Sequence, residues 1–299
     1  MSPLVSVVMP VYNAEEFISD AISSILNQTY THFEFIIVND GSTDGSLSII
    51  EQYAIRDRRI RVINRGNLGI SFSLNEAISV SSGVYVARMD ADDISLPTRL
   101  EHQVNAMSRS KLDICGGNYY VIDKFGKVID VLRCVRTHCL CQLALLYKVP
   151  FAHPTVMINK SFLTQNCLQY RNVPAEDLDL WARMSYAGAR FGNVDDYLLK
   201  YRYLSTSLSR RKRVAIRTST LRILKEYRKY MSRSLPKWQK FFNSQLSREE
   251  YSVITRSLYY LNAYKNTSAL QLCRILSNIP LSVSLHAFLG LIKNELFIK

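Results

Sequence analysis

Neither of the common glycine-rich phosphate loops occurs in this 299-residue sequence. There is no GxGxxG after the first predicted strand, and no GxxxxGK[ST] anywhere. Those loops hold phosphate groups with backbone N–H groups in dinucleotide-binding proteins and P-loop enzymes. Their absence argues against both classes, so any bound phosphate must be neutralised in another way.

Cysteine is scarce and shows no pairing pattern. The six cysteines lack the spacing of a disulfide framework, which favours a reducing compartment. Cys134, His138, Cys139 and Cys141 lie close in sequence, but their spacing is not that of a structural zinc site. We interpret them as packing residues.

Long apolar runs are also few. The first one ends at Pro10 and no basic segment precedes it, so we expect no signal peptide and a cytoplasmic protein. One uncharged stretch, residues 275–292, is long enough to span a bilayer. Asn, Pro, His and Ser residues interrupt it, which favours a buried or interfacial helix, while a membrane span stays open.

The net charge of +13 is concentrated in one segment. Residues 1–209 carry 20 Lys or Arg against 21 Asp or Glu, whereas residues 210–240 carry 12 against one. Apolar and aromatic residues alternate with these cations, which predicts a basic amphipathic helix. Such a helix favours an anionic membrane surface as partner. A solvated helix face is the alternative, and no nucleic-acid module is recognisable.

The first hundred residues alternate between strand and helix patterns. We predict strands at 5–9, 33–39, 60–64 and 85–89, and helices at 46–53, 71–79 and 96–107. The first helix has its apolar face from Ala14 to Leu26, with Asn13 as N-cap and Glu16 as its reciprocal partner. Strands at 114–122 and 127–132 and a helix at 178–186 complete the pattern. It predicts an α/β fold with a mainly parallel sheet covered by helices.

Polar loops follow three of these strands, at residues 10–13, 39–45 and 88–93. The carboxyl ends of parallel strands share one edge of a sheet, so carboxylates from separate loops are expected to gather there around one cation. Asp90 and Asp92 are two residues apart and would project to the same side of an extended backbone, as a Mg²⁺ or Mn²⁺ site requires. Turn and helix-cap roles for Asp40, Asp44 and the Asp90 cluster are the alternatives.

Together these segments resemble the family 2 nucleotide-sugar glycosyltransferases of the GT-A fold, over about residues 5–202. The resemblance rests on Val5-Ser6-Val7-Val8-Met9-Pro10-Val11-Tyr12-Asn13, Ile37-Val38-Asn39-Asp40-Gly41-Ser42-Thr43-Asp44-Gly45 and Arg88-Met89-Asp90-Ala91-Asp92-Asp93, followed by Leu96-Pro97-Thr98-Arg99-Leu100. It implies a Rossmann-like GT-A catalytic domain at 1–208, followed by a basic helical C-terminal region at 209–299.

The resemblance also assigns roles to residues on the donor side. Asp90 and Asp92 would form the Asp-x-Asp motif that holds Mn²⁺ or Mg²⁺, with Asp92 the more direct ligand. The implied nucleotide and donor contacts are Pro10 and Tyr12 at the nucleobase, Glu15 at the ribose, Asp40 as acceptor of a hydrogen bond from the base, Asp90 near the ribose, and Arg88.

On the acceptor side the resemblance assigns a catalytic base to the pair Glu176 and Asp177, with Asp177 preferred. The pair could instead merely begin a helix. His153 and Trp181 are weaker acceptor-side candidates. Leu74 and Leu204 depart from the family pattern, since Arg and His often stand there. Without that His, the cation would depend more on water and the diphosphate.

The resemblance implies a metal-dependent, inverting transfer of a sugar from a nucleotide-diphosphate donor, such as a UDP-sugar, to a hydroxyl group. The expected acceptor is a lipid-linked glycan of bacterial O-antigen or capsule biosynthesis. The expected location is the inner face of the cytoplasmic membrane. The alternatives are a sugar nucleotidyltransferase and a non-catalytic membrane adaptor.

Overall fold

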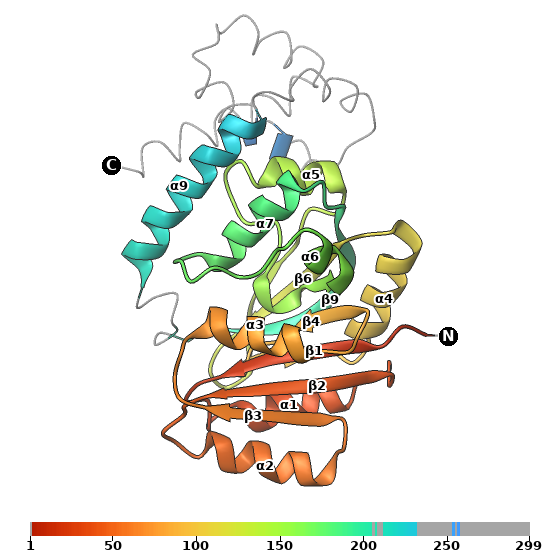
Figure 1. Ribbon diagram of the computed structural model, residues 1–299, viewed down its shortest axis with the longest axis vertical. Coiled ribbons are helices and arrows are strands. Elements are labelled where there is room, and N and C mark those ends of the chain that lie inside the picture. Colours follow the sequence, from red (N-terminus) through yellow and green to blue (C-terminus); the bar gives the residue numbers. More distant parts are fainter. Residues whose placement is uncertain (1, 205–206, 208–211, 232–252, 255, 258–299) are drawn as a thin grey trace, which may run out of the picture.

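The chain folds around one mixed sheet with helices on both faces, as the computed structural model in Figure 1 shows. The structure describes residues 2–204, 207, 212–231, 253–254 and 256–257. The strand order is β3-β2-β1-β4-β8-β6-β9-β5, and β7 pairs with β6 beside this path. The predicted α/β fold is confirmed.

The first half of the sheet is entirely parallel. Its elements are β1 (Val5–Val11), α1 (Ile18–Leu26), β2 (Phe33–Asp40), α2 (Ser46–Arg56), β3 (Ile60–Arg65), α3 (Ile70–Val80) and β4 (Tyr85–Arg88). Strand β1 lies between β2 and β4 and runs parallel to both. The carboxyl ends of these strands therefore lie at one edge, and the predicted elements agree within a few residues except at α1.

The second half of the sheet is mixed. It contains β5 (Ile94–Ser95), α4 (Arg99–Ser110), β6 (Ile114–Ile122), β7 (Val128–Leu132), α5 (His138–Ala144), a 3₁₀ turn (His153–Thr155), β8 (Met157–Asn159), α6 (Lys160–Gln165), α7 (Glu176–Tyr186) and β9 (Phe191–Arg202). The short strand β8 is antiparallel to both β4 and β6, while β6 and β9 are parallel. The prediction of a mainly parallel sheet thus describes the first half of the sheet best.

Two apolar clusters pack on opposite faces of the sheet. In β1, Val7 and Met9 face the cluster that includes α1 and α4, while Val8 faces the cluster that includes α3 and α7. This alternation follows the two-residue period of a strand. Because both faces are covered, the strand is apolar at almost every position, and each buried side chain stabilises the fold by about 1.5–3 kcal/mol.

The predicted start of the first helix is wrong. Helix α1 begins at Ile18, and Asn13 lies in the left-handed region with φ of 50°. Asn13 Oδ1 accepts a hydrogen bond from Thr43 N at 2.8 Å, and Asn13 N donates to Ser42 Oγ at 3.1 Å. Asn tolerates this backbone conformation, so the residue ties the loop after β1 to the loop after β2 instead of capping a helix.

The basic segment forms helix α9 (Arg213–Met231), which confirms the helical prediction for those residues. Its apolar face is buried against the protein rather than free: Tyr227 is fully buried, and its hydroxyl lies 2.9 Å from Ser185 Oγ in α7. Leu224 joins the same core. The buried residues of this face are therefore unavailable to lipid, and the exposed side chains of α9 include its cations and three apolar or aromatic residues, Val214, Leu221 and Tyr230.

Part of the predicted basic segment, residues 232–240, lies outside the described residues, as does the uncharged stretch 275–292. Among the residues that the structure describes, no helix is both long enough and apolar enough to cross a membrane.

Candidate active site

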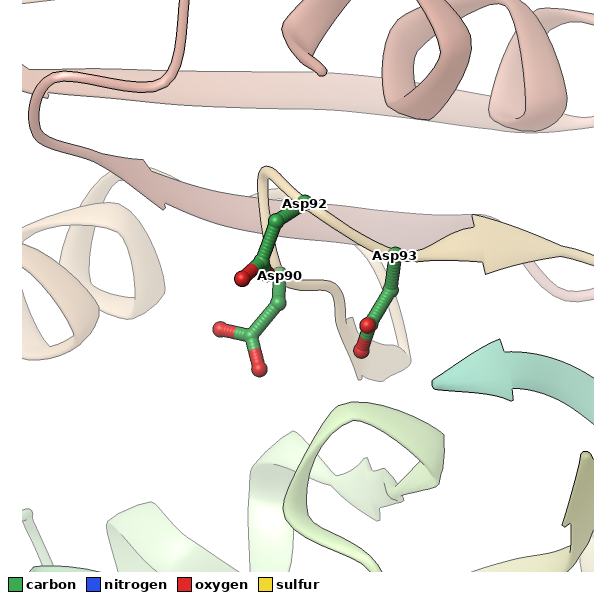
Figure 2. Close-up of side chains that lie close together, drawn as sticks. All are labelled: Asp90, Asp92 and Asp93. Atoms are coloured by element: carbon green, nitrogen blue, oxygen red, sulfur yellow. The ribbon is translucent and has the colours of Figure 1, made fainter. Parts of the chain in front are cut away.

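Three aspartates gather in a tight turn directly after β4. One carboxylate oxygen from each of Asp90, Asp92 and Asp93 lies within 4.8 Å of the others. Figure 2 shows the three side chains extending from the turn toward the same side. The turn, not the extended backbone that we expected, brings them together. The cluster also comes from one strand-helix junction, although we expected separate loops to contribute.

The charges of this cluster are poorly compensated. Burial and the neighbouring Asp90 carboxylate raise the pKa of Asp92 to about 6. Burial also raises the pKa of Asp93 well above its usual value. Asp93 is 1% exposed, and its Oδ2 has no hydrogen-bond partner among the described residues. Buried carboxylates that repel one another, one of them with an oxygen that has no hydrogen-bond partner among the described residues, suit a hard divalent cation.

Arg202, at the end of β9, holds this turn in place. Its backbone N–H donates to Asp93 Oδ1 at 2.7 Å, and its Nε donates to the carbonyl of Asp92 at 2.8 Å. The guanidinium stacks on the ring of Phe17, 4.4 Å from the ring centre. Our sequence analysis gave Arg202 no role. Asp93 was likewise named in the motif but given no role.

The loop after β1 carries Pro10, Tyr12 and Glu15, which we predicted to contact the nucleotide. Pro10 is partly buried, and Tyr12 is 54% exposed. Glu15 is already engaged, because its Oε2 accepts a hydrogen bond from Gly45 N at 2.8 Å. Glu15 N also donates to Asp44 Oδ2 at 3.1 Å. These bonds fix the first two loops of the edge to each other, and the ribose contact of Glu15 stays a prediction.

Asp40 lies at the same edge but outside the aspartate cluster, because β1 separates β2 from β4. Its carboxylate forms an ion pair with Arg65 and accepts hydrogen bonds from Leu68 N and Gly69 N, each at 2.8 Å. Asp40 thus orders the loop between β3 and α3. Its contact with the nucleobase stays a prediction.

The two carboxylates predicted to supply the catalytic base lie at the start of α7. Glu176 and Asp177 do begin a helix, as the alternative interpretation proposed. The preceding Ala175 is held in the left-handed region with φ of 61°, which is rare for a residue other than glycine. Burial, and then the charge of Asp177, raise the pKa of Glu176 to about 7. Burial also raises the pKa of Asp177. Strain and raised pKa values together are typical of functional sites.

His153 lies beside this pair. Its Nε2 is 2.9 Å from the hydroxyl of Tyr170, and its Nδ1 is 3.9 Å from Glu176 Oε1. Burial lowers the pKa of His153 well below its usual value, so the ring is neutral. Tyr170 was missed from the sequence. Asn75 fixes its position, accepting from Tyr170 N and donating to Tyr170 O at 2.9 and 2.8 Å.

Trp181, an acceptor-side candidate, lies in the core of the protein. The indole is fully buried, and it packs edge-on against His153, Tyr170 and Phe151. A side chain buried in this way supports His153 from behind and does not line an open acceptor surface.

Arg88 connects the two halves of the site. Its side chain is buried and forms an ion pair with Asp90. Its positive charge also opposes the rise in the pKa of Asp92, Glu176 and Asp177. Arg88 therefore acts electrostatically on donor-side and acceptor-side carboxylates alike.

Known proteins of one family are similar to this chain in sequence. The family described as Glycosyl transferase family 2 matches residues 6–167. The O-antigen biosynthesis glycosyltransferase WbnJ of Escherichia coli is 34% identical over 202 residues, which cover 67% of this chain and 79% of WbnJ.

Solved structures share the fold at low sequence identity. S. aureus TarS 1-349 in complex with UDP-GlcNAc has a TM-score of 0.61 at 18% identity, covering 95% of this chain and 79% of that one. The mannosyltransferase PcManGT from Pyrobaculum calidifontis, in complex with GDP-Man and Mn²⁺, has a TM-score of 0.56 at 15% identity. That match covers 93% of this chain and 79% of PcManGT. The expected GT-A fold is confirmed.

Proposed function

The chain belongs to glycosyl transferase family 2, and from that premise we propose a metal-dependent, inverting transfer of a sugar from a nucleotide-diphosphate donor. The family makes the chain a glycosyltransferase and leaves the nucleotidyltransferase and adaptor alternatives without support. The single observation that carries the metal proposal is the crowding of Asp90, Asp92 and Asp93 in one turn, where the pKa values of Asp92 and Asp93 are raised.

Asp92 and Asp90 would hold the cation, with the buried Asp93 beside them. Mn²⁺ or Mg²⁺ bound there would offset the negative charge that grows on the departing diphosphate. Pro10, Tyr12, Glu15 and Asp40 are proposed to contact the nucleoside from the loops of the parallel edge. TarS with UDP-GlcNAc and PcManGT with GDP-Man and Mn²⁺ support a nucleotide-sugar donor, and we favour UDP.

The acceptor hydroxyl must lose a proton as it attacks the anomeric carbon. We assign that proton to Asp177, with Glu176 beside it as the second carboxyl. The side chains of His153 and Tyr170 pack beside Glu176 and are neutral. They add no positive charge, so they do not favour the ionised form of Glu176 or Asp177. Because a single displacement by the acceptor inverts the anomeric carbon, this arrangement supports an inverting reaction.

The proposed acceptor is a lipid-linked glycan of surface polysaccharide biosynthesis, supported by the similarity to WbnJ, an O-antigen biosynthesis glycosyltransferase. Exposed cations on the outer face of α9, among them Arg217, Arg222 and Lys225, would attach the enzyme to an anionic membrane surface. We place it at the inner face of the cytoplasmic membrane.

A thermal-shift titration tests the donor site. With Mn²⁺ present, one nucleoside diphosphate should raise the melting temperature, because a ligand that binds only the folded state stabilises it by about 2.7 kcal/mol at a hundredfold excess over its dissociation constant. The same nucleotide with EDTA should give a much smaller shift. If UDP, GDP and the other diphosphates all leave the melting temperature unchanged with Mn²⁺ or Mg²⁺, the donor proposal fails.

The pH dependence of activity tests the base. Catalysis needs the ionised carboxylate of Asp177, whose pKa is raised by burial, so kcat/KM at saturating Mn²⁺ should rise with pH until Asp177 is ionised and then level off. Glu176→Gln leaves Asp177 in place, so it should keep the plateau within about tenfold. A plateau lowered by about 10³-fold would instead identify Glu176 as the base.

The raised pKa of Glu176 also makes the stability of the substrate-free protein depend on pH. Because its folded-state pKa lies above the ordinary value of 4.5, the contribution of Glu176 to the free energy of folding is fully present below pH 4.5 and is lost as the pH rises through about 7.

A further inference from the structure

The hairpin that joins β6 to β7 is unusually apolar for an exposed segment. We call residues 123–133 the hairpin arm. Phe125 in its turn is 83% exposed, and every residue of β7 is exposed. The large apolar side chains of β7 are Val128, Ile129, Val131 and Leu132, which are 44%, 53%, 46% and 38% exposed. A contiguous apolar patch of this kind marks an interaction surface.

The apolar residues lie on both faces of the arm. The pairing with β6 carries a bulge at Ile129, because Ile122 pairs with Val128 and Val121 with Asp130. Val128 and Val131 therefore share one face, and Leu132 lies on the other. Within the described residues, β7 pairs only with β6. A flat protein partner would cover one face of such an arm, whereas lipid can surround both.

The charges of the arm suit a membrane interface. Lys124 and Lys127 flank Phe125 and are exposed, and Lys124 Nζ lies 4.7 Å from the centre of the Phe125 ring. The arm has two acidic groups, and both accept hydrogen bonds from its own backbone: Asp123 Oδ1 accepts from Phe125 N at 2.9 Å and from Lys127 N at 3.0 Å, and Asp130 Oδ1 accepts from Val131 N at 2.7 Å. Aromatic side chains flanked by lysines are favoured at the level of anionic headgroups.

The arm is linked to the aspartate cluster. Arg202 donates from Nε to the carbonyl of Asp92, and its NH1 donates to the carbonyl of Lys124 at 2.8 Å. One side chain thus contacts both the aspartate turn and the turn of the arm. Whatever binds the arm lies near the site where the acceptor must arrive.

We propose that the hairpin arm dips into the headgroup region of an anionic membrane, next to the active site. This inference rests on the proposed transfer to a lipid-linked acceptor, and it deepens it. Most of the apolar face of α9 is buried in the protein, so that helix supplies mainly charge, and the arm adds a further apolar contact. The depth is interfacial, because the open edge of β7 needs hydrogen-bonding partners that hydrocarbon lacks.

A second copy of the chain fits the arm less well. Antiparallel pairing of two β7 strands centred on Asp130 would place Asp130 opposite its own copy and Lys127 opposite Arg133. Like charges directly opposite each other destabilise a strand pair. Charged residues on an edge strand are a common protection against such pairing.

Flotation of the full-length protein with vesicles tests the proposal. Wild-type protein should float with phosphatidylcholine vesicles that contain phosphatidylglycerol, and part of this binding should persist from about 0.05 M to about 0.5 M salt. The double variant Phe125→Ser/Ile129→Ser should lower vesicle partitioning about tenfold at both salt concentrations. Arg217→Gln/Lys225→Gln on α9 should lower it only at low salt.

Ile55→Ser is the matched control, because Ile55 on α2 is 86% exposed and lies outside the arm. It should float like wild type. Flotation of the Phe125→Ser/Ile129→Ser variant at the wild-type level would overturn the proposal, and so would light scattering that showed a wild-type dimer converted to a monomer by that variant. An unchanged Mn²⁺-dependent nucleotide shift in the variant would separate either failure from a failure of the proposed function.

Discussion

Replacing Asp92 by Asn is expected to have opposite effects on the protein with and without its cofactor. Without metal, Asp92→Asn should raise the free energy of unfolding by about 1 kcal/mol, which corresponds to about 2–4 °C in melting temperature. With Mn²⁺ and the nucleotide, the stabilisation seen in the wild type should be lost. Donor turnover, measured as release of nucleoside diphosphate, should fall by about 10³-fold.

Both effects come from the same crowding of charge. The pKa of Asp92 is raised to about 6 because burial and the Asp90 carboxylate oppose its ionisation. Near neutral pH the free protein is therefore destabilised by a charge that Arg88 and Arg202 compensate only in part. Asn keeps the shape and removes the charge, so the free protein relaxes while the metal loses a ligand.

A control separates this effect from a general loss of negative charge. Asp196→Asn removes the same charge from a side chain that is 51% exposed, and it should leave the nucleotide shift and turnover within about twofold. A Mn²⁺-dependent nucleotide shift of wild-type size in Asp92→Asn would contradict the assignment of Asp92 to the metal.

The fold of the parallel first half, from β1 to β4, could be predicted because local sequence pattern and tertiary burial agree there. Strand β2 is predicted at 33–39 and observed at Phe33–Asp40, since an apolar run buried on both faces leaves few other structures open. The first helix failed at Asn13 for a physical reason. Its hydrogen bonds go to residues 42 and 43 of another loop, and a cap motif read along the chain cannot show a partner about 30 positions away.

The candidate site divides in the same way. Asp90 and Asp92 were found because neighbours in sequence stay neighbours in a turn. Arg202 was missed because it contacts that turn from a strand about 110 residues later. Tyr170 reaches His153 only after α3 has fixed its backbone through Asn75. The apolar residues of α9 were predicted as a free face, and only packing against α7 shows that the protein itself covers several of them.

Asp177→Asn is expected to lower donor turnover by about 10³-fold while nucleotide binding stays intact. The change removes the group that takes the acceptor proton and leaves the aspartate cluster unchanged. Turnover should be measured as nucleoside diphosphate release with glycan or water as acceptor, and binding by the thermal shift with Mn²⁺. A loss in turnover with an unchanged shift places the effect on the chemical step and not on the donor site.

The matched control lies two residues further along the same helix. Asp179→Asn removes an equal charge from the first turn of α7, where Asp179 pairs with Arg183 at 2.7 Å, so it reproduces any effect on helix stability. It should lower turnover by less than about threefold, because Asp179 pairs with Arg183 and Arg171 and lies outside the pair that we assign to the acceptor proton. If both variants lose turnover equally, the acidic residues act through the helix, and the base must be sought at Glu176. Because Ala175 holds the start of α7 in a strained left-handed turn, the orientation of Asp177 depends on that one residue as well as on its own side chain.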